Sequence, residues 1–517
     1  MAESIWSRRR FLYLTGGGAV ALGLGACSSG ARDTAAPTGR PGGTLRILAS
    51  DGSPNDTLDP LRMERAFQIL AAPLIYESLV DLDEQLLPVP RLAESFTPAA
   101  GGKSWTFRLR TGVTFHDGAP LTPADVAFSI TRALDPDAGS GNSLAGQLKG
   151  ILAPAGIKVV DDRTVRFDLA QAYVYFPNAM ATRFARIYQA NTTDFGKPVG
   201  TGPFRFVSLT AGREFVAARN PAYWRNKVSL DRVVISNVAE DASRVSSLLA
   251  GDADLVFEIS LAAAQDIKQA DGYTILEQAN ARWLSLALDS TVAPFDKPAV
   301  VQAVKLALDR QQIIDNALGG FGTIGYDTPI AAQDKWFGQL PTPKRDVAAA
   351  KRLLATAGFP NGLDLPRVVG LSDEPATMAF LQVAQQQLRE AGIRFEITPE
   401  SGATYWDNSW LKKPDYSNTY LRRPPDEIMK LVFLSSGEWH QSRRADAEID
   451  RAINAASQTT DLDQQIAQYA TAQRLIAERD STIVPAHFPR LSGMGGQVRG
   501  VRTNPVYFLE VDRATVG

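Results

Sequence analysis

The clearest pattern of hydrophobic and polar positions lies between residues 104 and 134. Apolar and polar side chains alternate over residues 104–110, which is the period-two pattern of a half-buried strand. The dipeptide Asp117-Gly118 then marks a turn. Thr122 has the features of a helix N-cap, because a proline follows it and an aspartate stands three residues later. This stretch therefore predicts a strand, a turn and a capped helix.

The same two periodicities recur along the chain and predict a mixture of strands and helices, that is, an α/β protein. We expect strands over 42–48, 204–209, 283–288, 393–398, 481–488 and 506–511, and a hairpin over 157–169. We expect helices over 67–79, 122–134, 242–250, 298–308, 347–357, 377–391, 445–456 and 464–477. The glycine-rich run 200–204 is followed by a strand rather than a helix, which argues against a phosphate-binding loop.

Length and composition indicate a folded, multidomain protein. The chain has 517 residues, 44% hydrophobic and 21% charged, so we expect two or three domains. The net charge of −2 shows no electrostatic footprint for nucleic acid. Cys27 is the only cysteine, so an internal disulfide is excluded.

The first 27 residues have the features of an export signal rather than of a folded segment. Residues 7–12 read SRRRFL, which resembles a twin-arginine motif, although the general secretion route stays open. The following apolar run is shorter than the roughly twenty residues that cross a bilayer. It ends in LGAC, which resembles a lipobox, so we expect acylation of Cys27 and stable membrane anchoring. The alternative is an ordinary signal peptide with an incidental cysteine. Residues 28–41 are predicted to be a flexible tether.

The string from Leu92 to Leu134 carries a family resemblance. It reads LAESFTPAAGGKSWTFRLRTGVTFHDGAPLTPADVAFSITRAL. This resembles, almost without interruption, the signature of the family 5 extracytoplasmic solute-binding proteins, the peptide- and nickel-binding subunits of ABC importers. Further matching segments read GGTLRI, LDP, GTGPF, RNPAYW, AGDADL and PFDKP, so the resemblance covers residues 42 to about 512. It favours a turn, rather than a catalytic or metal-binding role, for His116 and Asp117.

The resemblance implies a two-lobed, periplasmic-binding-protein-like α/β fold that closes on its ligand by a hinge motion. Lobe 1 would comprise residues 42–287 and 485–517, with an extra subdomain over about 76–198, and lobe 2 would comprise residues 288–484. Two hinge strands, near 283–288 and 482–487, would join the lobes. The protein would be an extracytoplasmic monomer that docks on membrane permease subunits, with separate ATPase subunits supplying the energy.

Catalytic and metal-binding motifs are absent from the sequence. It contains no HExxH, CxxC, GxSxG or EF-hand pattern, and its three histidines are dispersed. We therefore predict that the protein is not an enzyme and has no cofactor and no metal site.

The resemblance points to two ligand-binding segments, near Glu64 in lobe 1 and over residues 406–426 in lobe 2. In peptide binders of the family, an aspartate in a DYPDP-like run pairs with the peptide's amino terminus. This chain departs from that run and reads WxK followed by RPxxD, which puts a peptide ligand in question. Asp426 is the candidate partner of a ligand cation and Arg423 that of a carboxylate or phosphate. The alternative is that both cap the following helix.

Aromatic and basic residues supply further candidates. Stacking on the ligand is possible for Trp406, Trp410, Tyr420 and Trp439, although aromatic residues at this density are more often core. Three pairs of basic residues are near them in sequence, at 412–413, 422–423 and 443–444. They form either a solvent-exposed face or a site for an anionic ligand.

The leading hypothesis is a lipid-anchored, solute-binding protein that delivers a peptide or a similarly sized polar solute to an ABC importer. A non-peptide ligand is the first alternative: a metal chelate, an opine-like or phosphorylated compound, or haem. An exported enzyme or chaperone on the same scaffold is the second.

Overall fold

A mixed sheet organises the fold. The computed structural model describes residues 41–139, 143–506 and 508–517, and residues 39–517 form one compact unit. The signal motif, Cys27 and nearly all of the expected tether lie outside the described residues. Within them, the large sheet has eleven strands in the order β10-β11-β12-β1-β13-β21-β14-β20-β17-β19, with β15 paired to β21. These strands are Thr44–Ala49 (β1), Phe204–Thr210 (β10), Glu214–Arg219 (β11), Arg232–Asn237 (β12), Leu255–Val256 (β13), Tyr273–Leu288 (β14), Thr323–Ile324 (β15), Val368–Leu371 (β17), Ile397–Glu400 (β19), Asp415–Leu421 (β20) and Ala486–Gly495 (β21).

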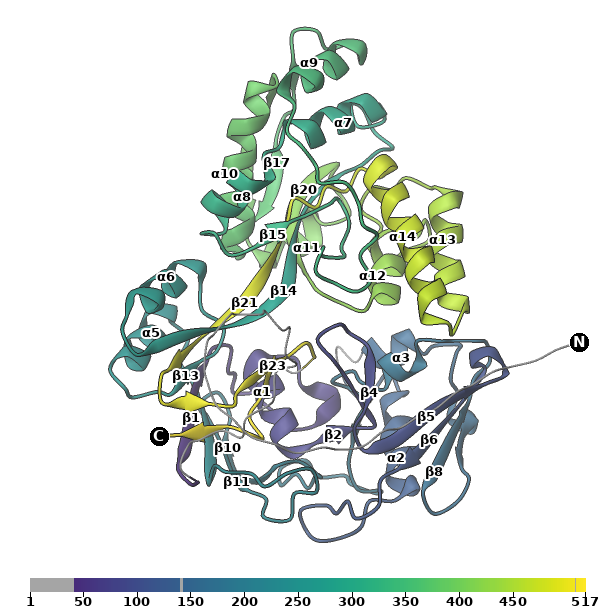
Figure 1. Cartoon of the computed structure of the whole chain (residues 1–517), viewed down its shortest axis with the longest axis vertical. Coiled ribbons are helices and arrows are strands. Elements are labelled where there is room, and N and C mark those ends of the chain that lie inside the picture. The colour runs from purple at the N-terminus through teal and green to yellow at the C-terminus, as the bar shows by residue number, and fades with distance from the viewer. Residues whose placement is uncertain (1–40, 140–142, 507) are drawn as a thin grey trace, which may run out of the picture. The chain divides into compact units, whose positions relative to one another are not determined.

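Two long strands, β14 and β21, join the two lobes (Figure 1). The first part of β14 pairs with β21, and its last part, Arg282–Leu288, pairs with β20. We call the side that carries β1 and β10–β13 lobe 1, and the side that carries β17, β19 and β20 lobe 2. The eight residues from Ala281 to Leu288 contain only one that is not buried, so this part of β14 is fixed by packing on both faces.

Lobe 1 also contains a four-stranded sheet, β5-β6-β8-β7, formed by Ala93–Ala99, Ser104–Leu109, Thr164–Asp168 and Ile157–Val159. Alternate residues of β6 are buried, and Phe107 packs edge-on against Phe167 at 5.4 Å. The remaining lobe 1 elements are α1 (Ala66–Ile75), α2 (Pro123–Ala133), α3 (Ser143–Gln147), α4 (Phe176–Ala179), α5 (Asp241–Leu249), α6 (Leu261–Gln269), and the short strands β2 (Glu77–Ser78), β3 (Val80–Leu82), β4 (Pro88–Pro90), β9 (Arg186–Ile187), β22 (Val498–Arg499), β23 (Arg502–Asn504), β24 (Phe508–Glu510) and β25 (Thr515–Val516).

Lobe 2 consists of helices packed on its part of the large sheet. The helices are α7 (Pro298–Ala307), α8 (Arg310–Ala317), α9 (Val347–Thr356), α10 (Pro375–Glu390), α11 (Gly402–Asn408), α12 (Pro425–Val432), α13 (Ala447–Gln458) and α14 (Leu462–Arg479), with a small parallel pair β16 (Leu363–Asp364) and β18 (Ile393–Arg394). Short 3-10 helices cover Pro60–Arg62, Ala100–Gly102 and Pro154–Gly156. None of the helices in the described part of the chain is both long and apolar enough to cross a bilayer.

Most predicted elements are confirmed. The capping box is present at the start of α2, where Asp125 Oδ2 accepts hydrogen bonds from the Thr122 amide (2.8 Å) and hydroxyl (2.7 Å). The turn at His116 is confirmed too. Its Nε2 donates to the Gly202 carbonyl at 3.0 Å and its Nδ1 accepts from the Gly200 amide at 3.3 Å, so the turn is fixed against the glycine-rich run.

Several predicted boundaries are wrong. The first helix ends at Ile75 rather than 79, because the chain there enters β2. The strand predicted over 481–488 begins at Ala486 and continues through Pro489 to Gly495. The strand predicted over 393–398 is split into β18 and β19, which pair with different neighbours. The last predicted strand, 506–511, is reduced to β24, the second arm of a hairpin with β23.

Candidate functional site

A pocket of about 670 Å³ lies between the two lobes. Ligand pockets in proteins usually measure about 300–1,000 Å³, so a small solute fits this volume. Two further cavities have about 110 Å³ and 20 Å³, and the smaller has room for about one water molecule. Four parts of the chain that are distant in sequence line the large pocket. They are residues 173–184, 278–281 and 421–439, and the group Pro505, Val506 and Phe508, together with residues near 82–86 and 143–151 and Arg490.

An irregularity in β14 shapes one wall of the pocket. The pairing of β14 with β21 shifts register between Gln278 and Arg282, and Asn280 has a φ of 51°. Such bulges change the direction of side chains and strengthen the local twist. Gln278, Ala279 and Ala281 line the pocket here, so the strand that joins the lobes also contributes to the site.

The start of α12 provides another part of the pocket wall. Pro424 and Pro425 fix the entry of the chain into the helix, since proline is favoured in the first turn. Arg423 lies just before the helix and forms an ion pair with Glu427, one turn further on. Its guanidinium also lies 5.1 Å from the ring centre of Trp439, which is a cation–π distance.

The carboxylate of Asp426 faces protein partners. Asp426 is 3% exposed and forms an ion pair with Lys430 at 2.9 Å. Its Oδ1 also accepts hydrogen bonds from the hydroxyl groups of Ser457 and, at 3.4 Å, Tyr469. The charge of Asp426 is therefore balanced inside lobe 2, even though the residue contributes to the pocket wall.

The predicted aromatic residues form a ladder beside the pocket. Trp406 contacts Trp410 (5.5 Å between ring centres), and Trp410 contacts Trp439 (5.9 Å). Tyr420 stacks on Trp439 at 6.0 Å and accepts a hydrogen bond from the indole of Trp410 at 2.8 Å. Only Trp439 of this group lines the pocket.

The other sequence candidates are dispersed. Glu64 is exposed and does not line the pocket. Of the three pairs of basic residues, only Arg422 and Arg423 reach it. Arg422 forms an ion pair with Asp334 at 2.5 Å, and Arg443 forms one with Asp289 at 3.0 Å.

Arg183 is the pocket residue that the sequence did not single out. It belongs to the aromatic-rich stretch 173–184, and its guanidinium lies 4.7 Å from the ring centre of Phe184. Burial lowers the pKa of Arg183 from its usual value, and the nearby charge of Arg423 lowers it further. Its Nε is buried and has no hydrogen-bond acceptor, and Arg183 forms no ion pair within the described residues.

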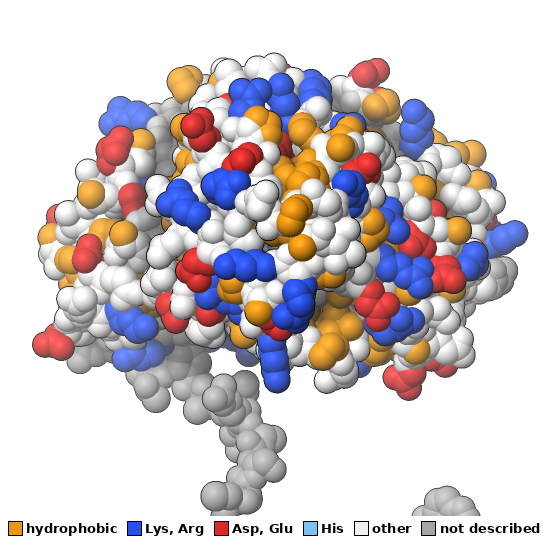
Figure 2. All heavy atoms as spheres, turned by 90° about the horizontal axis from the view of Figure 1, so that it is seen from above, with side chains coloured by type: hydrophobic (Ala, Val, Ile, Leu, Met, Phe, Trp, Pro, Cys, Tyr) orange, Lys and Arg blue, Asp and Glu red, His pale blue; other side chains and the backbone are white. Residues whose placement is uncertain are grey.

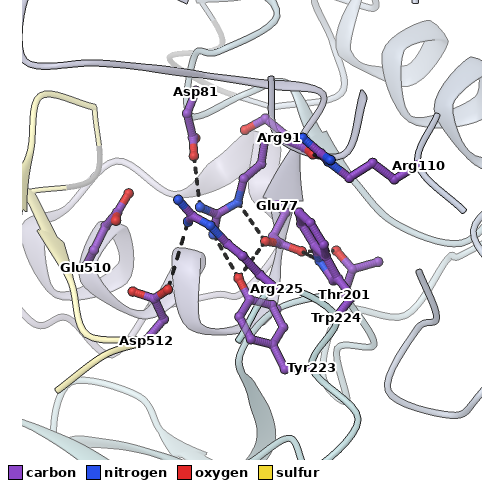
Figure 3. A network of polar contacts seen from close by, with 12 residues as sticks. Glu77, Asp81, Arg91, Arg110, Thr201, Tyr223, Trp224, Arg225, Glu510 and Asp512 are labelled. Carbon is purple, nitrogen blue, oxygen red and sulfur yellow. Dashed lines mark hydrogen bonds and ion pairs between the residues drawn. The ribbon is translucent and has the colours of Figure 1, made fainter. Parts of the chain in front are cut away.

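The motifs that carried the family resemblance meet at a different place, around Glu77 (Figure 3). The carboxylate of Glu77 accepts hydrogen bonds from four side chains, at 2.7 to 2.9 Å. The donors are Arg91, Thr201, Tyr223 and Trp224. We call these five residues the Glu77 cluster. Glu77 is 2% exposed, and the cluster joins the segments YES, RLAE, GTGP and NPAYW.

The glycines of the GTGP segment are required by close backbone approach. A Cβ on Gly200 would lie 1.9 Å from the Ile75 carbonyl oxygen, and one on Gly202 would lie 2.5 Å from that of Leu74. The Gly202 amide donates to the Ile75 carbonyl at 2.9 Å. These glycines therefore dock the segment on the end of α1, and the expectation that they do not form a phosphate-binding loop fits this packing.

Comparison with known proteins shows which family the chain belongs to. A family model described as bacterial extracellular solute-binding proteins, family 5 Middle, matches residues 88–425. The chain belongs to this family. It is thus the substrate-binding protein of an ABC importer, a binding protein rather than an enzyme, and it acts outside the cytoplasm.

Individual relatives of this solute-binding protein cover most of its length. It is 28% identical over 465 residues to heme-binding protein A of Haemophilus influenzae, covering 83% of this chain and 85% of that one. It is 28% identical over 357 residues to the glutathione-binding protein GsiB of Pectobacterium atrosepticum, covering 67% and 68%. The structure of HbpA2 from Haemophilus parasuis has a TM-score of 0.81 at 22% identity, covering 92% of this chain and 100% of that one, which shows the shared fold.

No group of three or more histidine, cysteine, aspartate or glutamate side chains in the described residues is placed to hold a metal ion. Burial lowers the pKa of His116 to about 4 and that of His487 to about 3. Both histidines are held as neutral packing residues.

Proposed function

We propose that this solute-binding protein captures a peptide or a similarly sized polar solute in the pocket between its lobes and delivers it to a membrane permease. Separate ATPase subunits would supply the energy. The observation that carries the proposal is the pocket itself. It has about 670 Å³, it is lined from both lobes, and it combines aromatic walls with charged side chains. Sites of this kind bind polar solutes with specificity.

The proposed motion is a rotation of lobe 2 about the joining strands, with lobe boundaries near residues 287–288 and 484–485. Contacts across the pocket support the closed arrangement. The Trp336 indole of lobe 2 donates to the Gln85 carbonyl of lobe 1 at 2.9 Å, and Tyr175 of lobe 1 packs on Tyr469 of lobe 2 at 6.5 Å. Opening would separate these groups, and closing on a solute would restore them.

We also propose that Cys27 is acylated and anchors the protein at the outer face of the cytoplasmic membrane, after export by the twin-arginine route. The LGAC sequence and the arginine-rich start of the chain support this proposal. In the anchored state, residues 28–41 would serve as the tether. Cys27→Ser should release the protein into the soluble fraction, and a variant that stays membrane-bound would exclude the anchor.

A pocket-filling variant tests the binding role. Ala279 is exposed to the pocket, so Ala279→Trp should occupy part of its volume and abolish the stabilisation that bound solutes confer in a thermal-shift screen. Ala262→Trp on α6, which is exposed and does not line the pocket, is the matched control. Equal responses of both variants and the parent protein would place the solute elsewhere.

A further inference from the structure

Five basic side chains line the pocket, and they differ in whether they have an acidic partner. Four of the basic side chains have an acidic partner: Arg422 with Asp334, Arg423 with Glu427, Lys430 with Asp426, and Arg490 with Glu258. Arg183 has no such partner among the described residues. Glu438, the remaining acidic residue of the lining, is exposed. Arg183 is therefore the basic side chain of the lining that is left without an ion-pair partner in the described part of the chain.

The surroundings of Arg183 make the missing partner unfavourable without a ligand. Its Nε is buried and has no acceptor, and a buried donor without a partner destabilises the folded protein. Arg423 is a like charge close enough to lower the pKa of Arg183. The charge of Glu64 raises the pKa of Arg183, but Glu64 and Arg183 form no ion pair within the described part of the chain.

Arg423 also has an N–H donor that lacks an acceptor. One of its terminal nitrogens contacts Glu427, while its Nε is buried and has no acceptor. Both guanidinium groups lie over aromatic rings, Phe184 for Arg183 and Trp439 for Arg423. Such stacking fixes a guanidinium and leaves its N–H edge free for a planar oxyanion, which it binds in a bidentate manner.

We infer that Arg183 and Arg423 together bind an oxyanion of the solute, so that the pocket selects an acidic solute. This inference rests on the proposed function and names the charge class of its ligand. A carboxylate and a phosphate share the required chemistry.

The role of Asp426 follows from the same balance. A ligand ammonium group at Asp426 would have to displace Lys430, which already lies 2.9 Å from the carboxylate. Two hydroxyl groups use its Oδ1 in addition. The residue therefore holds the end of the pocket wall in place, and recognition of the solute rests on the arginines.

The experiment compares matched acids and amides by calorimetric titration of the purified protein. The probes are glutathione and trialanine, each as the free acid and as the carboxamide, with inorganic phosphate as a separate arm. The acids should bind at least about tenfold more tightly than their amides. Arg183→Gln and Arg423→Gln should each remove this preference. Arg183→Lys keeps the positive charge but loses the planar guanidinium that binds an oxyanion with two N–H groups, so it should retain part of the preference.

Each outcome decides between the claims. A further outcome is that phosphate competes with an acid for the site in the parent protein and fails to bind to Arg183→Gln. This result would also support the oxyanion site and would assign phosphate to it. Amides that bind as tightly as acids, or a preference that survives in both glutamine variants, would overturn the inference and leave the proposed function standing. If no acid, amide or phosphate binds, the proposed function itself is contradicted. Arg451→Gln, an exposed arginine on α13, is the control and should behave as the parent protein. Circular dichroism melting curves verify that each variant is folded.

Discussion

The Glu77 cluster and the interlobe pocket both contain buried arginine, carboxylate and aromatic side chains, but their polar groups are satisfied to different degrees. In the cluster, one carboxylate receives four hydrogen bonds and Arg91 also contacts Asp81 at 3.1 Å. In the pocket, Arg183 has no acidic partner among the described residues. A satisfied network stabilises a structure, whereas an unsatisfied one is free to bind a partner.

The Glu77 cluster therefore stabilises the fold, whereas the pocket determines which solute is bound. The segments that make the chain recognisable as a family member meet at Glu77, where they fix the end of α1, the glycine-rich run and the turn at Tyr223. The pocket draws instead on segments without a recognisable motif. Substitutions at the hydrogen-bonded Glu77 carboxylate should therefore act mainly on stability, and substitutions in the pocket mainly on solute binding.

The largest effect is expected at the cluster. Glu77→Gln should lower the free energy of unfolding by about 3–5 kcal/mol, because it leaves Arg91 buried without its main partner. Urea unfolding measures this loss. Glu94→Gln is the matched control, since Glu94 forms exposed ion pairs with Arg108 and Arg163 and should lose less than about 1 kcal/mol. Equal losses in both variants would show that the cluster does not stabilise the fold.

Acid should weaken the folded state through His116. Burial lowers the pKa of His116 from 6.5 to about 4. As the pH falls through this window, the unfolded chain takes up a proton that the folded chain does not, so stability decreases, by at most about 3 kcal/mol. The stability curve of His116→Gln should be shallower between pH 6.5 and 4. An unchanged slope would contradict the assignment of a neutral buried His116.

Arg183→Gln should separate affinity from stability. Because the substitution removes a half-buried charge that has no ion-pair partner among the described residues, the free energy of unfolding should change by less than about 1 kcal/mol or even increase. Solute affinity should nevertheless fall about tenfold or more. A loss of stability of several kcal/mol would instead show that Arg183, like Glu77, belongs to the scaffold.

The smallest effect on solute affinity is expected at the part of the aromatic ladder that does not line the pocket. Trp410→Phe removes the hydrogen bond to Tyr420 and should cost about 0.5–1.5 kcal/mol of stability without changing solute affinity. Trp439→Ala should reduce affinity, because Trp439 lines the pocket and supports Arg423. Isothermal titration calorimetry of both variants measures which of the two residues contributes to solute affinity. A loss of affinity in Trp410→Phe would show that the binding site also includes Trp410.

The scaffold could be predicted from the sequence because its determinants are local. The capping box at Thr122, the turn at His116 and the two-lobed fold follow from short strings of residues and their family resemblance. Arg423 was found because it lies in the segment that departs from the family pattern, and Trp439 was found as one of the aromatic residues near that segment.

Arg183 could not be found in this way. Its importance depends on the lack of an ion-pair partner among the described residues, which is a property of the folded neighbourhood and not of the string AMATRFARI. The bulge at Asn280 and the hairpin of β23 and β24 were missed for the same reason. Each contributes to the pocket only after segments far apart in sequence pack together.

The most direct test of the central claim, that an arginine without a protein partner selects the solute, is the identity of what the protein retains. Small molecules released on denaturation from the parent protein and from identically prepared Arg183→Gln are compared by mass spectrometry. The account predicts an acidic solute in the parent protein and its loss from the variant. A neutral or cationic solute retained equally by both proteins would contradict it.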